Sequence, residues 1–354
     1  MKNLLRLALL TMLLAFSSCQ KEDFTVDENK QSTKAEIRYV VPNNQYQLRS
    51  TAHVNGMLEF PDVVTFLSTI DNLETQAELY DDNFMNNWGH LNDEDIDNKE
   101  DELNYDPQQP YIDFEKGFSG FRSLRRQVES DIEQWLNKTI LDETKDPEDH
   151  FIFDDELRSV LNEDAQVKIG KSLFQMTRFG YVEVTDGDYN TLGLVATSDA
   201  SKLNLQNVII HGGYYGSSSG NNNQNNSTTC RTNIEYGQSY YPESNRRIKA
   251  SQKLKGYTYV FGSKIKAKTI HYKKKNGKWK RRRAWITAKI EGDAVNEFCS
   301  LPTNQNQNKH KKRRKVKAKI TSSSLSGNWY KTEQLKLRTI HKRENVSYTD
   351  YFFN

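Results

Sequence analysis

Opposite charges gather in two separate parts of this 354-residue chain, although its net charge is only +3. From Asp71 to Asp164 there are 28 acidic and 8 basic residues, a formal charge of −20. From Glu243 to the end there are 30 basic and 7 acidic residues, a formal charge of +23. Segregation on this scale sets the electric field of each part, and so the partners that it attracts. One interpretation is internal: the basic part docks on the acidic part, and each lowers the exposed field of the other.

The first 18 residues have the order of a bacterial lipoprotein signal peptide. Lys2 and Arg6 precede an apolar run over 7–16, and Cys19 follows two serines. The run is too short for a transmembrane helix, which needs about 20 apolar residues. The pattern resembles signals after which the cysteine is acylated and becomes the first residue of the mature protein. We therefore expect a lipid on Cys19; an ordinary secretory signal with an incidental cysteine is the alternative.

The residues after Cys19 bear on location. Segment 20–23 looks like the short acidic tag that sends lipoproteins of the Bacteroidota to the outer face of the outer membrane. The rest of 19–34 is polar and charged, which predicts a disordered tether between lipid and folded body. We expect a lipid-anchored outer-membrane protein; exposure at the cell surface and a position on the inner leaflet are the two alternatives.

Two cysteines remain once Cys19 carries a lipid. Cys230 and Cys299 form an even pair in an oxidising compartment, which predicts a disulfide worth about 4 kcal/mol in the chain-entropy model. Two buried free thiols are the alternative. Neither residue has a second cysteine or a histidine at metal-ligand spacing, so no metal site is expected there.

Segment 35–211 is expected to be an acidic α+β domain. Short strands in 35–60 precede a helix that starts at Pro61 and Asp62. Its apolar residues recur at helical spacing: Val63, Phe66, Leu67, Ile70 and Leu73. A second helix should start near Ser119, with Phe121, Leu124, Val128, Ile132 and Trp135 on its buried face.

Three more features complete the expected first domain. Segment 93–106 is expected to be an acidic loop, and 154–161 a short third helix. Strands are then expected over 167–169, 173–177, 181–185 and 208–210, where apolar residues alternate or run together.

The low-complexity stretch 212–229, rich in Gly, Ser and Asn, is expected to be a linker. A long loop within one domain is the alternative. Segment 230–354 is then expected to be a basic, all-β domain, a small β-sandwich of the immunoglobulin-like kind. Its later strands should lie around 316–320 and 335–340, with 304–308 joining strands.

The pair Asn276-Gly277 is the strongest short hairpin signal, since both positions of such a turn take φ > 0. It predicts that 263–272 pairs with 284–290 and that Lys275 lies opposite Lys278. The apolar face is then Ile265, Ala267, Ile286 and Ala288. The opposite face is basic and aromatic: Lys266, Lys268, Tyr272, Lys274, Trp279, Arg281, Arg283 and Trp285.

This layout resembles uncharacterised outer-membrane lipoproteins of the Bacteroidota. The shared features are the stretch Gly117 to Phe121 in a helical region, Ile169-Gly170 before paired strands, and a basic β domain at the end. The resemblance spans 55–354 and implies a location and a shape, but no activity.

The basic-aromatic hairpin face is the candidate binding site. Its aromatic rings would stack on bases or sugars while its cations meet phosphate or sulfate. A second basic run, Lys309 to Lys319, would extend it. The expected partners are an anionic polysaccharide, lipopolysaccharide, extracellular nucleic acid or other envelope proteins. A solvated face whose aromatics a neighbouring loop covers is the alternative.

Catalytic and metal motifs are missing from the sequence. Asp93, Asp95 and Asp97 are spaced like the start of a calcium loop, but Asn98 and Asn104 stand where an EF-hand needs Gly and Glu. Weak Ca²⁺ binding is the most that this loop would support, and we expect no cofactor. No P-loop, dinucleotide fingerprint, nucleophile elbow or zincin helix occurs.

Three hypotheses follow. The first is a non-enzymatic envelope lipoprotein whose basic β domain binds an anionic polymer or partner. The second is a structural or assembly component in which the acidic and basic domains dock together. The third is a hydrolase that lacks a recognisable motif.

Overall fold

The computed structural model describes most of the chain from residue 37 onward. The described ranges are 37–42, 55–138, 140–178, 180–197, 205–212, 235–242, 244–255, 261, 264–294, 303–321, 337–344 and 346–351. The segment Arg38–Asn354 forms one compact unit.

Several sequence predictions fall outside the described residues. Cys19, Cys230 and Cys299 lie outside them, as do the signal peptide, the tether and 213–229 of the expected linker. Lipidation, the disulfide and the linker therefore stay predictions.

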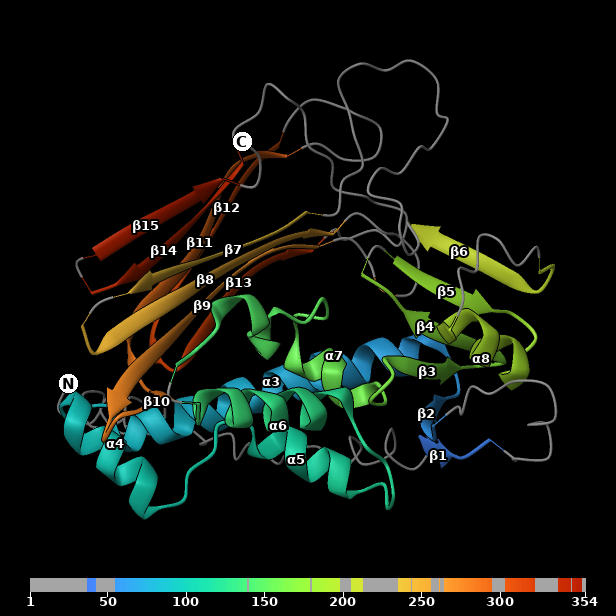
Figure 1. The fold of residues 1–354 in the computed structure, drawn as a ribbon, viewed down its shortest axis with the longest axis horizontal. Helices are drawn as coiled ribbons and strands as arrows, with labels where there is room; N and C mark the ends of the chain where they lie inside the picture. The colour runs from blue at the N-terminus through green and yellow to red at the C-terminus, as the bar shows by residue number, and fades with distance from the viewer. Residues whose placement is uncertain are drawn as a thin grey trace, which may run out of the picture. The chain divides into compact units, whose positions relative to one another are not determined.

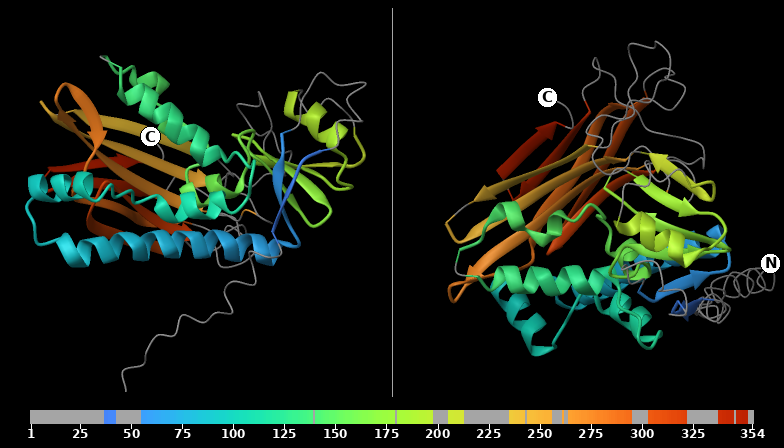
Figure 2. Two further views of the ribbon diagram at one scale, coloured as in Figure 1. Left: turned by 90° about the horizontal axis from the view of Figure 1, so that it is seen from below. Right: turned by 45° about the vertical axis from the view of Figure 1, so that its right-hand side comes forward.

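The first half of the molecule is a helical region with a mixed β-sheet (Figure 1). Within the described ranges the strand order is β1-β2-β3-β4-β5-β6, with β2 and β3 parallel and the other neighbours antiparallel. The strands are β1 (Arg38–Val40), β2 (Met57–Phe60), β3 (Gln166–Ile169), β4 (Ser172–Met176), β5 (Gly180–Val184) and β6 (Val208–Gly212). Leu192 of helix α8 (Tyr189–Thr197) packs on Met57, Leu173 and Val184, so α8 covers one face of this sheet (Figure 2).

The long first helix confirms its sequence signal. Helix α3 (Val63–Trp88) begins after Asp62, whose side chain accepts a hydrogen bond from the Thr65 N–H at 2.7 Å. The predicted stripe faces inward, with Phe66, Ile70 and Leu73 buried. The other helical elements are α4 (Asp93–Glu102), α5 (Gln109–Lys116), α6 (Leu124–Leu136), η3 (Glu143–Lys145), η4 (Pro147–Asp149) and α7 (Asp155–Val160).

Helix α6 begins later than the sequence predicted. Its N-cap is Ser123, which accepts a hydrogen bond from the Arg126 N–H at 3.1 Å, so the expected start near Ser119 is wrong. Phe121 is buried but precedes the helix. The rest of the predicted apolar face is buried, from Leu124 to Trp135.

The acidic loop predicted over 93–106 is also wrong, because most of it is helix α4. The Asn92 side chain accepts hydrogen bonds from the N–H groups of Glu94 and Asp95, at 3.0 and 2.9 Å. Acidic side chains in a first turn also suit the positive end of the helix dipole. Residues two apart on a helix point in different directions, so alternate aspartates in α4 do not converge as in a calcium loop.

The second half of the molecule is formed by antiparallel β-sheets. One holds β7 (Glu235–Pro242), β8 (Arg246–Lys255), β9 (Lys264–Lys275), β10 (Lys278–Arg281) and β13 (Lys315–Thr321). The other holds β11 (Ala284–Ala294), β12 (Thr303–Arg313), β14 (Arg338–Arg343) and β15 (Val346–Tyr351). An apolar cluster joins them: Ile265, Ala267, Ala284, Ile286, Ala288, Ile290, Val316, Ala318, Ile320 and Leu337.

The predicted hairpin turn is confirmed. Lys275 lies opposite Lys278, and Asn276 and Gly277 have φ of 53° and 78°. The predicted pairing of 263–272 with 284–290 is wrong. Strand β10 ends at Arg281, and β11 pairs with β12 and β14 in the other sheet. The predicted apolar residues still share one core, because they face each other from two sheets.

Two further expectations have mixed outcomes. Segment 304–308 was expected to join strands, but it lies inside β12. The strand expected at 316–320 is confirmed as part of β13. The strand expected at 335–340 is confirmed in part, since β14 starts at Arg338.

Candidate functional site

One face of the sheet that contains β9 is built from cationic side chains. Alternate residues of a strand point to the same side, so Lys266 and Lys268 share a face. The register places Lys253 and Lys319 opposite Lys266, and Lys317 opposite Lys268. Like charges directly opposite each other destabilise a sheet. This lysine face therefore needs an anionic cover.

Segment 142–160 provides that cover, and Figure 1 shows α7 along the β9 and β13 side of the strands. The Lys268 Nζ donates to a Glu148 oxygen at 2.8 Å, and Lys266 donates to Asp154. In β8, Lys249 donates to Asp146 at 3.0 Å. These six side chains are buried, so the ions face each other with little water between them.

The lysines of β13 reach the same acidic layer. Lys317 donates to Glu156 at 2.7 Å, and Lys315 pairs with Asp155. Both carboxylates stand in the first turn of α7, next to its positive dipole end. Alternate lysines of β13 thus meet successive carboxylates of one helix turn.

Two carboxyl groups of this cover, Glu148 and Asp154, are held ionised. Burial raises the pKa of Glu148, but the charges of Lys268 and Lys315 outweigh burial and hold that pKa well below its usual range. Burial likewise acts on Asp154, and the Lys266 charge keeps its pKa low. These two carboxyl groups therefore remain charged at neutral pH and depend on their cations.

A second cluster ties helices α3 and α4 to the arginines around β10, β12 and β13. Glu100 accepts hydrogen bonds from Arg283 and, at 2.7 Å, from Arg314. Arg282 lies 3.8 Å from the same carboxylate. Asp81 pairs with Arg283 as well. A single carboxylate, Glu100, thus lies beside three guanidinium groups.

Helix α3 contributes a row of carboxylates at spacing of four: Glu74, Glu78 and Asp82. Residues four apart share a helix face. Glu78 accepts from Lys309 at 2.6 Å, and Asp82 accepts from Lys311 at 3.1 Å. The basic run 309–319 of the sequence analysis is therefore paired with α3 and α7 along much of its length.

The structure places the predicted binding residues in different surroundings. Lys266 and Lys268 are covered as described, and Arg283 is buried between Asp81 and Glu100. The remaining residues of that set are Tyr272 (buried), Arg281 (paired with Glu129), Trp279 (half-buried), Lys274 (exposed) and Trp285 (49% exposed).

The aromatic residues of that set do not share one exposed surface. The Arg247 guanidinium lies 4.9 Å from the Trp279 ring centroid and 5.0 Å from that of Tyr272. Trp285 belongs to the other sheet and stacks on His310, with ring centroids 5.0 Å apart. Ligand binding by these residues stays a prediction.

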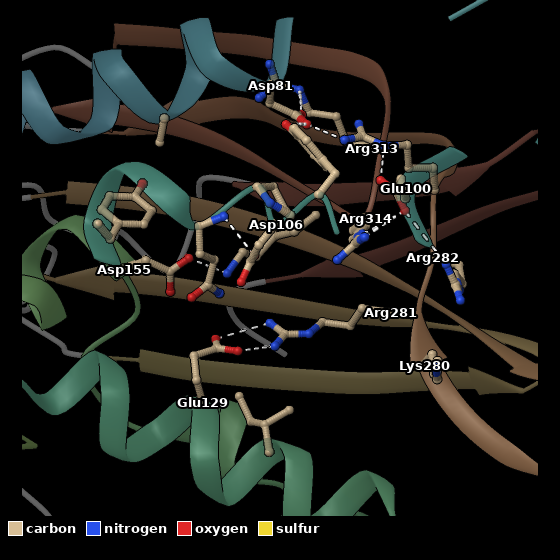
Figure 3. Close-up of a pocket in the computed structure, with 18 of the residues that line it drawn as sticks. Asp81, Glu100, Asp106, Glu129, Asp155, Lys280, Arg281, Arg282, Arg313 and Arg314 are labelled. Carbon is tan, nitrogen blue, oxygen red and sulfur yellow. Dashed lines mark hydrogen bonds and ion pairs between the residues drawn. The ribbon is translucent and has the colours of Figure 1, made fainter. Parts of the chain in front are cut away.

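A cavity of about 760 Å³ lies between the helices and the basic strands (Figure 3). Arg281 and Arg314 point toward its centre from the strand side, and Glu129 of α6 meets Arg281 from the helix side. Tyr105, Tyr111 and Trp279 add aromatic surface to its wall. The volume is typical of sites for small ligands.

Two absences concern the described part of the chain alone. No group of three His, Cys, Asp or Glu residues there is arranged to hold a metal ion. No described helix has both the length and the apolar character needed to cross a membrane.

Sequence reasoning offered docking of the basic part on the acidic part, but it did not identify segment 142–160 as the partner of the lysine face. A signal was available: eight of the fifteen residues in 142–156 are acidic, and lysines alternate in β9 and β13. The cavity has no such signal, because helices and strands far apart in sequence form its wall.

Comparisons with known proteins found one distant structural similarity and no match to a family model or a curated protein. The chain is similar to the crystal structure of a DUF4848 family protein from Bacteroides thetaiotaomicron VPI-5482, at 12% identity with a TM-score of 0.19. That match covers 83% of this chain and 96% of the other. It is a distant structural match to an uncharacterised protein and carries no argument about function.

Proposed function

We propose that this chain is a non-enzymatic envelope lipoprotein in which the acidic helical layer docks on the basic β-sheets to make a structural or assembly component. The observation that carries the proposal is the pairing of the lysine face: Lys249, Lys266, Lys268, Lys315 and Lys317 each meet a carboxylate of segment 142–160. A chain with such segregated charge thereby neutralises much of its own field.

The proposal includes the lipid anchor and the location that the sequence predicts for residues outside the described ranges. A lipid on Cys19 would anchor the body to the outer membrane, with neighbouring envelope proteins as its partners. The two face-to-face sheets would form a sandwich of the immunoglobulin-like kind. The absence of catalytic motifs from the sequence favours a non-enzymatic role.

Binding of a long anionic polymer along the hairpin is the weaker candidate. Lys266, Lys268 and Arg283 would have to exchange their carboxylates for the polymer. Buried charge pairs lose several kcal/mol when one partner is withdrawn, so the cover competes strongly with any outside polyanion.

Charge reversal tests the docking. Glu74 accepts from Lys319 at 2.6 Å, and both side chains are partly buried. Glu74→Lys or Lys319→Glu alone should each cost about 1–3 kcal/mol of the free energy of unfolding. The double reversal should recover much of that loss, as urea unfolding would measure. Additive losses would contradict docking at this pair.

A heparin column separates the two functions. The full chain should elute at low salt, because its basic strands are covered. Strong, salt-sensitive retention would instead support the polymer-binding hypothesis. A panel of glycan and peptide substrates, with and without Ca²⁺, tests the hydrolase hypothesis.

A further inference from the structure

The cavity wall holds more cations than carboxylates. Its lining contains thirteen Lys and Arg side chains against nine Asp and Glu. Some wall cations pair with carboxylates outside the wall: Arg125 with Glu115, and Lys317 with Glu156. A molecule in the cavity lies closer to these cations than to the carboxylates that pair with them. Because Coulomb energy falls with distance, the attraction of the cations for an anion in the cavity should exceed the repulsion by those carboxylates.

Some wall cations keep free capacity for an anion. In the described structure, Arg126, Lys278 and Lys280 form no ion pair within 4 Å, and all three are exposed. Lys280 interacts with the Asp101 carboxylate only at longer range. They stand where the cavity reaches solvent, a position from which exposed charges steer an incoming anion. Asp106 and Glu133 are wall carboxylates that likewise lack a cationic partner in the described part, and they leave the cations in the majority.

Arg314 is the cation best placed inside. Its Nε and Nη2 both donate to one oxygen of Glu100, at 3.2 and 2.7 Å. That carboxylate is also shared with Arg283 and Arg282. A guanidinium has five N–H donors, so Arg314 has donors left to offer toward the space that Figure 3 shows around it.

We propose that this cavity binds a small ligand with a phosphate or sulfate group on a sugar-sized body, held by Arg314 and approached past Lys280. Arginine suits such anions because its planar fork donates two parallel hydrogen bonds. The volume exceeds what a bare anion needs, and Tyr105, Tyr111 and Trp279 offer flat surfaces to a ring. This binding site is a proposal separate from the docking proposed above, which the charge reversal of Glu74 and Lys319 tests.

Calorimetric titration of the full chain tests the site with glucose 6-phosphate, inorganic phosphate, sulfate and uncharged glucose. Glucose 6-phosphate should bind tightest, either bare anion more weakly, and glucose not at all. Bare anions that bind as well as the sugar phosphate would overturn the sugar-sized ligand. No binding of any anion at millimolar concentration would overturn the site.

Variants locate the binding. Arg314→Met should weaken glucose 6-phosphate binding about tenfold or more, since hydrogen bonds to charged groups are among the stronger ones. Lys280→Ala, at an exposed side chain, should weaken it about threefold. Lys342→Ala removes an exposed lysine of β14 outside the wall and should change nothing. Wild-type affinity in both cavity variants, or weakening by Lys274→Ala in place of Lys280→Ala, would overturn the assignment.

Discussion

The two faces of strand β9 are buried in different ways. Ile265 and Ala267 face the second sheet and pack in an apolar cluster. Lys266 and Lys268, their neighbours in sequence, face the acidic layer and are buried too. One strand thus separates an apolar core from a core of paired charges.

The difference concerns where stability comes from. Burying apolar surface is favourable in itself, by about 25 cal/mol per Å². Burying an ion pair is close to neutral overall, because desolvation offsets the attraction, but loss of one partner is costly. The apolar face should therefore drive folding, whereas the charged face should specify which layer docks there.

Removing Glu148 should have the largest effect. Its buried carboxylate forms an ion pair with Lys268 at 2.8 Å and also lies near Arg158 and Lys315. Glu148→Ala would leave three cations around an empty position. We expect a loss of about 3–5 kcal/mol or more in the free energy of unfolding by urea.

Ile286→Ala on the apolar face is the matched comparison and should cost about 2–5 kcal/mol through lost burial and a cavity. Raised salt should not restore either variant, since buried charges are poorly screened. A loss below about 1 kcal/mol for Glu148→Ala would show that water or other groups replace the carboxylate.

Acidification should lower the free energy of unfolding in a different pH window for each face. The change is about 1.4 kcal/mol per pH unit for each proton that the unfolded chain binds in excess of the folded chain. On the apolar side, burial lowers the pKa of His341 to about 3, from 6.5. The folded state then binds fewer protons than the unfolded state between these values. Stability present above pH 6.5 should therefore fall as the pH drops toward 3.

For the two buried carboxyl groups of the charged face, Glu148 and Asp154, the pH window is lower. The pKa values of Glu148 and Asp154 lie well below their usual 4.5 and 3.8, so their contribution is full above about pH 4.5 and falls below it. Unfolding should be measured from pH 3 to 8 for the wild type and His341→Asn. The variant should lose part of the slope near pH 6, although His271, with a pKa of about 4, and His150, whose burial lowers its pKa to about 3, keep the rest. An unchanged slope would contradict the assignment to His341.

Replacing a whole pair should have a small effect. Lys266 and Asp154 are both buried and pair with each other. Lys266→Met together with Asp154→Leu should leave the free energy of unfolding within about 1 kcal/mol of the wild type, or raise it. Asp154→Leu alone should cost about 3 kcal/mol, because Lys266 stays buried. A double variant as unstable as the single one would mean that the pair drives folding.

Local sequence signals predicted local structure well. Asp62 and the apolar stripe of α3 predicted its start, and Asn276-Gly277 predicted the turn between β9 and β10. Long-range partners were not predictable in the same way. The alternation of β11 suits either sheet, so the sequence pattern could not show that the chain changes sheets after Arg281.

The lysine alternation of β9 was misleading for a physical reason. Alternating polar residues usually mark a solvent face, and only the three-dimensional position of 142–160 turns that face into an interior. Asn92, the N-cap of helix α4, is a residue type that the sequence could have indicated as a helix start, but the acidic composition of the segment favoured a loop. The cavity lies between α3–α6 and the strands β10, β12 and β13, so no single segment of the sequence has a pattern that predicts it.

The exposed rim of the same charge layer should respond least. Lys309 and Glu78 pair at 2.6 Å, yet each side chain is 39% exposed. Water and salt screen such a pair, and exposed pairs contribute about 0.2–1 kcal/mol. Lys309→Ala should therefore lower the free energy of unfolding by less than about 1 kcal/mol, and the loss should shrink further in 1 M salt. Lys342→Ala, an exposed lysine outside the layer, is the control. A loss for Lys309→Ala as large as that for Glu148→Ala would contradict this prediction. It would mean that the contribution of an ion pair to stability does not depend on its burial in this layer, and that exposed and buried pairs act as one network.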